Sequence, residues 1–289
     1  MIGKTRQKPA EVEEYFDPEV GKARGILSRH PPVEGKFRHS RRSPAAGLTC
    51  WIDHYWMVSW DLRGHGPYRP QTLPHPNFQV VFEKDHSLVS GVSTSLFTRT
   101  LEGKSHVFGV KFCAGAFRPF LHASASSLVN RTIAVNQIFE KEVDELEAVL
   151  VSPDKEEDQM IEAANAFFLP RVPAVPDETI VLAGQLVDRI LQDRAIKTVD
   201  DLVNKTGIGK RTLQRTFNEY VGVNPKWVIR RYRLHELIER IHSESSKPMD
   251  WAQFALELGY FDQAHLINDF RSIVGYSPVQ YQKRSGKNS

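Results

Sequence analysis

The hydrophobic residues change their spacing along the chain. Over residues 45–120, short apolar and aromatic runs alternate with turn-forming residues; the runs are 51–60, 78–82, 87–92 and 107–112. Runs of this length and spacing predict the strands of a small antiparallel sandwich or barrel. Over 143–150 and 158–168 the spacing becomes that of amphipathic helices, so helices are expected to follow the strands.

Three prolines then interrupt residues 169–176, and such a segment favours an extended, semi-rigid connection. The chain is therefore predicted to be an α+β protein of two domains, a β-rich sandwich or barrel with trailing helices followed by an all-α domain. The expected divisions are a flexible or irregular segment at 1–43, the β-rich domain at 44–169, the proline-rich linker at 170–178 and the helical domain at 179–284.

Within residues 200–232 the pattern predicts two short helices joined by a tight turn. Gly207 stands where such a turn needs a residue that tolerates a positive φ. In the next helix, expected at 210–220, Leu213 and Phe217 are four residues apart and share one face. The opposite face consists of Arg211, Gln214, Arg215 and Asn218. These side chains suit base edges in the major groove of DNA, although an ordinary amphipathic surface helix has the same pattern.

The same pattern recurs 53 residues later. The corresponding pairs are Leu213 and Leu266, Phe217 and Phe270, Gly222 and Gly275, and Pro225 and Pro278. An internal repeat of this length indicates a duplicated supersecondary unit. Two helix-turn-helix units on one rigid body can meet successive major-groove segments of DNA, about 34 Å apart.

These motifs resemble a known family. The sequences RTLQRTF at 211–217, GVNP at 222–225, GYFDQAH at 259–265 and GYSP at 275–278 are similar to the DNA-binding domain of AraC/XylS transcription regulators, over about residues 179–281. The resemblance implies two helix-turn-helix subdomains bridged by a long helix at 227–242. Carried over, the family's base-facing positions in the second unit are Gln263, Ala264, His265, Ile267 and Asn268.

Asn268 departs from the family's commoner pattern, because a basic residue such as Arg215 is frequent at this position. The second unit is therefore less basic than the first. We expect the first unit to contribute more base discrimination, and the second more positioning through backbone amides on phosphate. The second reading helix is expected to begin near Asp262, whose side chain can cap it.

The net charge of +3 matters less than its placement. Residues 205–233 hold one acid, Glu219, and eight bases: Lys205, Lys210, Arg211, Arg215, Lys226, Arg230, Arg231 and Arg233. A local basic field is the footprint of phosphate binding. For the three arginines of the bridging helix, pairing with Glu236 and Glu239 on the helix surface is an alternative.

The β-rich half carries a second resemblance. Tyr55-Trp56, the stretch LPHPNFQVVF at 73–82, and the segments GVKF and GAFRPF within 109–120 resemble the uncharacterised DUF6597 domain found ahead of some AraC-type DNA-binding domains, over about residues 51–168. This resemblance implies an effector or dimerisation domain and names no ligand. The aromatic residues Trp51, Tyr55, Trp56 and Trp60 either line a pocket or form core.

The sequence gives little support for a metal site, a cofactor or a reactive cysteine. The histidines His54, His75, His86, His106 and His122 form no H-x-H or H-E-x-x-H pair, so neither a metal nor a cofactor is expected. Cys50 and Cys113 are expected to be free thiols. Lys111 and Arg118 could lower the pKa of Cys113, but a small apolar role is the simpler interpretation.

The first residues lack the apolar core of a signal peptide, and no run approaches the ~20 apolar residues of a spanning helix, so a cytoplasmic protein with no membrane contact is expected. The predicted function is a sequence-specific transcription regulator that binds double-stranded DNA. RNA polymerase, a small-molecule effector and a second copy of the chain are further candidate partners. The alternatives are an enzyme or metal-binding cupin-like domain tethered to a DNA-binding module, and a protein-interaction adaptor.

Overall fold

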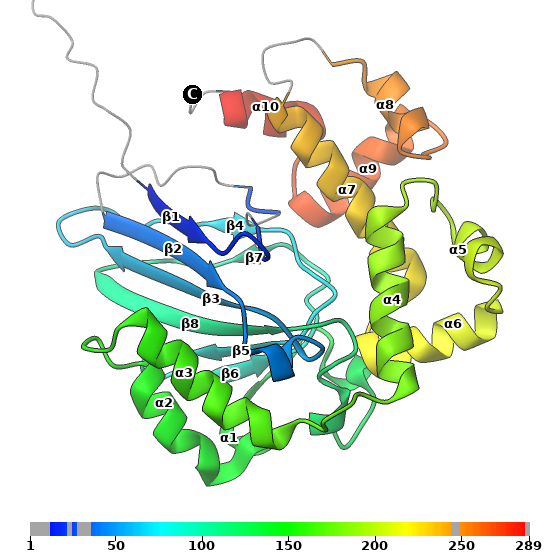
Figure 1. The fold of residues 1–289 in the computed structure, drawn as a ribbon. Helices are drawn as coiled ribbons and strands as arrows, with labels where there is room; N and C mark the ends of the chain where they lie inside the picture. The colour runs from blue at the N-terminus through cyan, green and yellow to red at the C-terminus, as the bar shows by residue number, and fades with distance from the viewer. Residues whose placement is uncertain (1–11, 22–24, 28–35, 244–248, 287–289) are drawn as a thin grey trace, which may run out of the picture.

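The computed structural model describes residues 12–21, 25–27, 36–243 and 249–286, and Figure 1 shows their arrangement. The strands are β1 Val12–Phe16, β2 Lys36–Arg42, β3 Ile52–Asp61, β4 Gln71–Thr72, β5 Gln79–Phe82, β6 Leu88–Ser90, β7 Phe97–Thr98, β8 Lys104–Phe112 and β9 Thr132–Ala134. The α-helices are α1 Asn136–Phe139, α2 Asp144–Leu150, α3 Glu157–Phe168, α4 Glu178–Gln192, α5 Val199–Thr206, α6 Lys210–Thr216, α7 Pro225–Ser243, α8 Trp251–Glu257, α9 Gln263–Val274 and α10 Pro278–Gly286.

The strands form a seven-stranded sheet in the order β1-β2-β3-β8-β5-β6-β9, and β4 pairs with β7 in a separate two-stranded sheet. The four runs predicted as strands are β3, β5, β6 and β8, and the two predicted helices are α2 and α3. A β-rich region followed by helices confirms the predicted α+β class. The pairing of β1 with β2 is parallel, whereas the other pairs described are antiparallel.

The expectation of irregular chain throughout residues 1–43 is wrong for β1 and β2; residues 1–11 lie outside the described ranges. Strand β2 was missed because neither of its faces is apolar. On one face, Arg38 and Arg42 form ion pairs with Glu157 of α3. A strand covered by charge pairs has no alternation of apolar and polar residues by which to recognise it.

The two faces of the sheet have different neighbours. One face packs against α1, α2 and α3, which lie along it in Figure 1. There Tyr55 of β3 is fully buried and donates a hydrogen bond from its hydroxyl to Asn165 Oδ1 of α3 (2.9 Å). The other face looks toward α4 and α7. One cluster of buried residues extends from Leu48 in the β-rich half to Ile229 in α7.

Residues 172–177 separate the two halves and form neither helix nor strand. Asp177 then caps α4 by accepting hydrogen bonds from the backbone amides of Thr179 and Ile180. Across the ranges that the structure describes, every helix is too short or too polar to span a lipid bilayer.

Candidate functional site

The first helix-turn-helix unit consists of α5, a turn and α6. Thr198 begins it with a capping box, because its hydroxyl accepts from Asp201 N (3.0 Å) while the Asp201 carboxylate accepts from Thr198 N (2.7 Å). Gly207 ends α5 at a φ of 70°, which confirms the predicted left-handed turn. Helix α6 continues through a π-helical turn, Phe217–Val221 (η6), so the helical backbone reaches one residue beyond the expected end.

Helix α6 has the two faces that its sequence predicts. Leu213 and Phe217 are fully buried and anchor the helix in the core. The side chains on the opposite face are all exposed, and they are Arg211, Gln214, Arg215 and Asn218. This exposed ridge therefore presents two guanidinium groups and two carboxamides to solvent.

A groove runs beside this ridge and continues to the start of α7. The ridge lines it together with Lys226 of α7 and with Thr94 and Val129 of the β-rich half. Lys210 at the start of α6 forms an ion pair with Asp200 (2.5 Å). In the described part of the chain, neither Arg211 nor Arg215 has a hydrogen-bond or ion-pair partner. Both guanidinium groups are thus available for phosphate or for the edge of a guanine.

The second unit repeats this arrangement with α8 and α9. Asp262 caps α9 by accepting from His265 N (2.7 Å), as predicted. Leu266 and Phe270 are fully buried, like their counterparts in the first unit. The positions carried over from the family mostly reach solvent: Gln263, Ala264, His265 and Asn268 are exposed, and Ile267 is half-buried. Arg271 is also exposed; it was missed, although it lies 53 residues after Asn218.

Of the arginines of the bridging helix α7 that lie within residues 205–233, Arg231 is buried, and Arg230 and Arg233 are half-buried and contact the protein. Arg230 pairs with Asp269 of α9 and donates to Ser272 Oγ (2.6 Å), which fixes α9 against α7. Arg231 is fully buried, and burial lowers its pKa to about 9. Arg233 donates to the Gly259 carbonyl (3.5 Å). The basic field predicted from residues 205–233 is therefore smaller on the surface than its sequence suggests, because α7 is packed against both units.

A cavity of about 1830 Å³ lies between the second face of the sheet and helices α4 and α7. Alternation along the strands decides which residues line it. Its apolar floor consists of Phe37, Trp56, Val58, Trp60, Val81 and Val107. Trp56 lies over Gly109 of β8, where an added Cβ would come within 1.9 Å of the indole ring. Glycine at this position thus allows the indole to approach the backbone of β8 closely.

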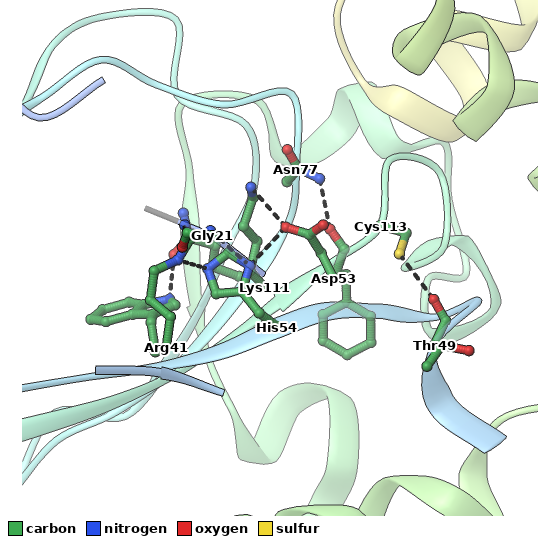
Figure 2. Close-up of polar contacts among 11 residues, drawn as sticks. Gly21, Arg41, Thr49, Asp53, His54, Asn77, Lys111 and Cys113 are labelled. Atoms are coloured by element: carbon green, nitrogen blue, oxygen red, sulfur yellow. Dashed lines mark hydrogen bonds and ion pairs between the residues drawn. The ribbon is translucent and has the colours of Figure 1, made fainter. Parts of the chain in front are cut away.

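The polar end of this cavity is a chain of hydrogen bonds, shown in Figure 2. Arg41 Nε donates to His54 Nε2 (3.0 Å), and Arg41 Nη2 lies 3.1 Å from His54 Nδ1. Asp53 Oδ2 lies 2.8 Å from the same Nδ1, and because a carboxylate only accepts, this contact is satisfied when a neutral His54 carries its proton on Nδ1. Lys111 Nζ contacts the same carboxylate oxygen at 3.0 Å. The group joins neighbouring strands, since Arg41 is on β2, His54 on β3 and Lys111 on β8.

Burial governs the protonation of this chain. It lowers the pKa of both His54 and His39 to about 4, even though the Asp53 carboxylate opposes the shift at His54. For Asp53 itself, burial raises the pKa, but Lys111 and His54 outweigh it and the net pKa is well below the ordinary value. At neutral pH the group therefore has a carboxylate at Asp53 and neutral imidazoles at His39 and His54. Burial also lowers the pKa of Lys111, against the attraction of Asp53.

The aromatic residues and histidines that the sequence offered as pocket or metal-binding candidates lie in different surroundings. Trp51 and Tyr55 are core, whereas Trp56 and Trp60 line the cavity. His75 packs against His235 of α7, His86 lines the cavity, His106 contacts the Leu150 carbonyl and His122 is exposed. No group of three or more potential metal ligands occurs in the described ranges.

Both cysteines are free thiols, as predicted. Activation of Cys113 is contradicted, because burial raises its pKa to about 12. The thiol instead donates weakly to the Thr49 carbonyl.

Two family models match the chain. Residues 202–284 match a family described as a helix-turn-helix domain, and residues 40–134 match a domain of unknown function, DUF6597. Residues 202–284 are therefore the helix-turn-helix domain of an AraC-type DNA-binding transcription regulator, and a DUF6597 domain precedes it in the chain. The helical match is to a DNA-binding family and not to an enzyme family.

A comparison with curated proteins finds no match. Among solved structures, ToxT from Vibrio cholerae is similar at 11% identity, with 86% of this chain and 98% of ToxT covered and a TM-score of 0.35. ToxT bound to an unsaturated fatty acid is similar at 11% identity, with 88% and 97% covered and a TM-score of 0.35. At TM-scores this low, neither the ligand nor the detailed fold of ToxT is transferred to this chain.

Proposed function

We propose that the chain regulates transcription by sequence-specific binding to double-stranded DNA. Arg211, Gln214 and Arg215, with Asn218, read one major-groove segment. Gln263, Ala264, His265, Ile267 and Asn268 meet the next. The observation that supports this proposal is the ridge of α6, which exposes two unpaired guanidinium groups opposite a fully buried anchor. Arg pairs bidentately with guanine, and Gln or Asn with adenine.

Selection of bound duplexes from a random pool by the full-length protein tests this function. A defined motif is expected, and its symmetry reports whether two copies bind together. Arg215→Ala is expected to cost ~1–3 kcal/mol at the selected site and to relax preference at one position. Lys226→Ala is expected to weaken all duplexes alike and to reduce the slope of log K against log salt by about 1.

Arg189 of α4, which is exposed, provides a matched control: Arg189→Ala removes a guanidinium group outside both units and is expected to leave the selected motif unchanged. Equal losses on selected and random DNA for Arg215→Ala would restrict that residue to phosphate contact. Absence of salt-dependent DNA binding by the full chain would favour the protein-interaction adaptor.

We further propose that the β-rich half senses a small molecule in the cavity between the sheet and α7. The cavity has an apolar floor and a polar end, as ligand pockets do. Its walls include Tyr232 and His235 of α7, the helix that joins the two units. A ligand here would contact the sheet and the bridging helix together, so its binding would influence how the two units are held.

Filling the cavity by mutation tests this coupling without a known ligand. Val58→Trp puts an indole into the floor and is expected to stabilise the fold by ~0.5–2 kcal/mol and to change DNA affinity severalfold. Val181→Trp, at an exposed position of α4, is the control and is expected to do neither. Stabilisation with unchanged DNA affinity would mean that the cavity is not coupled to DNA binding. Turnover or bound metal in the purified chain would favour the enzyme alternative.

The predicted divisions at 44–169, 170–178 and 179–284 remain proposals, as do the cytoplasmic location, contact with RNA polymerase and formation of a homodimer. Separate folding of the two halves is not required for the mechanism above. It requires only that α7 contacts both the cavity and the reading helices.

A further inference from the structure

The two reading helices, α6 and α9, can be compared position by position. Leu213 and Leu266 are both fully buried, and so are Phe217 and Phe270, so a shift of 53 residues superposes the inward faces of the helices. Outward positions related by the same shift are therefore equivalent. This correspondence shows what each helix offers to a duplex at the same place.

Equivalent outward positions carry different chemistry. Arg211 corresponds to Ala264, and Gln214 corresponds to Ile267. Two hydrogen-bonding side chains of the first unit are thus replaced by apolar ones in the second. Asn268 replaces Arg215 and keeps a carboxamide.

A third apolar side chain lies at the entrance to α9. Phe261 stands one residue before the cap Asp262 and is 86% exposed. The N-terminal residues of a reading helix are those that contact base edges, so this aromatic ring lies beside the part of α9 that would enter the groove. In the first unit a single residue, the half-buried Ile208, lies between the turn glycine Gly207 and the cap Gly209, whereas the second unit has two residues between Gly259 and Asp262. The second unit therefore has an exposed apolar group that the first lacks.

Apolar side chains in the major groove have one matching feature, the C5-methyl group of thymine. Asn pairs bidentately with adenine. The combination of Phe261, Ala264 and Ile267 with Asn268 therefore fits A·T pairs, whereas two arginines and a glutamine fit guanine and adenine edges. Arg271 is exposed further along α9, where it can contact a phosphate of the DNA backbone.

Exposed apolar residues also serve as contacts for proteins. Leu256 of α8 is 64% exposed and belongs to the same unit. It lies on the helix that precedes the turn, however, while Phe261, Ala264 and Ile267 follow one another at intervals of three residues along the start of α9. This placement on the reading helix favours DNA as the partner of the three residues.

We propose that the second unit selects A·T pairs by packing Phe261, Ala264 and Ile267 against thymine methyl groups, while the first unit selects guanine and adenine by hydrogen bonds. The inference rests on the proposed sequence-specific binding. It replaces the expectation that the second unit mainly positions the protein, and it gives both units a share in specificity. The selected motif should consequently have two dissimilar halves, one of them rich in A·T pairs.

Replacing thymine by deoxyuridine in the selected duplex tests the contact directly, because it removes one methyl group and leaves base pairing intact. With the full-length protein, each contacted thymine in the A·T-rich half should show about fourfold weaker binding after replacement, the effect of one buried methyl group. The same replacement in the other half should have no effect. Phe261→Ala and Ile267→Ser should each bind the thymine duplex more weakly and lose the response at one position.

Leu256→Ala is the matched control and should keep the full response to deoxyuridine, and thermal unfolding of each variant checks that it folds. Failure to select any motif would refute the proposed function itself. A motif without an A·T-rich half, or one whose binding ignores the methyl groups, would refute only this inference. Unchanged DNA binding by Phe261→Ala, together with loss of transcription in the presence of RNA polymerase, would assign the ring to a protein contact and overturn the proposal.

Discussion

At the scale of single residues, arginines close together in the sequence have different roles. Arg215 and Arg231 are 16 positions apart, yet one is exposed and the other fully buried. The difference arises from the helix that carries each, since α6 has one free face and α7 has almost none. Counting basic residues therefore overestimates the surface charge available for DNA. The buried Arg231 guanidinium has a lowered pKa because desolvation disfavours its charge.

The cavity histidines predict how stability depends on pH. The pKa of His54 is about 4 in the fold and 6.5 in the unfolded chain, and that of His39 is the same in the fold. Between these values the unfolded state binds more protons, so stability falls as the pH drops from about 6.5 toward 4. We expect a loss of ~1–3 kcal/mol per histidine, measured by urea unfolding at a series of pH values.

His54→Asn should flatten this pH dependence, since it removes one of the two titrating groups, whereas His65→Asn, at an exposed position, should leave it unchanged. The lost stability would be present above pH 6.5 and absent below pH 4 in the native sequence. An identical slope in native protein and His54→Asn would show that the imidazole is not held neutral.

At the scale of elements, a strand's two faces are what sequence pattern predicts best. Strand β3 was recognisable because Trp56, Val58 and Trp60 alternate with residues that the helices cover. The same pattern could not say which face is core and which lines a cavity, since both are apolar. That distinction depends on where α1, α2 and α3 pack, which is a long-range property of the chain.

Helices α6 and α9 were predictable down to their faces, because a 3.6-residue period and a repeat of 53 residues give the same assignment. The exposed ridge of α6 follows directly from Leu213 and Phe217. The groove beside it was not predictable, because Thr94 and Val129 come from loops distant in the sequence. The polar chain from Arg41 to Lys111 was missed for the same reason, since it joins three strands.

A pair of glycine variants tests how the elements meet. Gly109→Ala on β8 would place a Cβ within 1.9 Å of the Trp56 ring, so the indole must move and we expect a loss of ~1–3 kcal/mol. Gly184→Ala in the middle of α4 meets nothing closer than 3.6 Å and should gain up to ~1 kcal/mol from helix propensity. Urea unfolding measures both, with tryptophan fluorescence reporting on the indole. Equal effects of the two changes would contradict the close packing of Trp56 on Gly109.

At the scale of the whole molecule, both helix-turn-helix units are attached to the β-rich half. For the first unit, η6 packs against the short helix Ala125–Leu128, and a Cβ on Gly222 would lie 3.1 Å from the Ala125 carbonyl. For the second unit, Tyr276 donates to Gln71 Oε1 and Tyr281 to the Leu27 carbonyl, each at 3.3 Å. The distance between the reading helices is therefore determined by the β-rich half as well as by α7.

This attachment predicts a strict spacing between the two halves of the DNA site. Inserting one base pair between them rotates the second half by about 34° and moves it by about 3.4 Å, which a rigid protein cannot follow, so binding should fall at least about tenfold.

A double variant tests whether the β-rich half sets this spacing. Gln71→Ala combined with Tyr276→Phe removes one attachment of the second unit and keeps an aromatic ring at position 276 in its cluster. This double variant should lose only severalfold on the same insertion, as measured by equilibrium binding to the two duplexes. Gln185→Ala, at an exposed position of α4, is the control and should lose as much binding on the insertion as the native protein does. If the double variant kept it too, the contact between Gln71 and Tyr276 would play no part in setting the spacing.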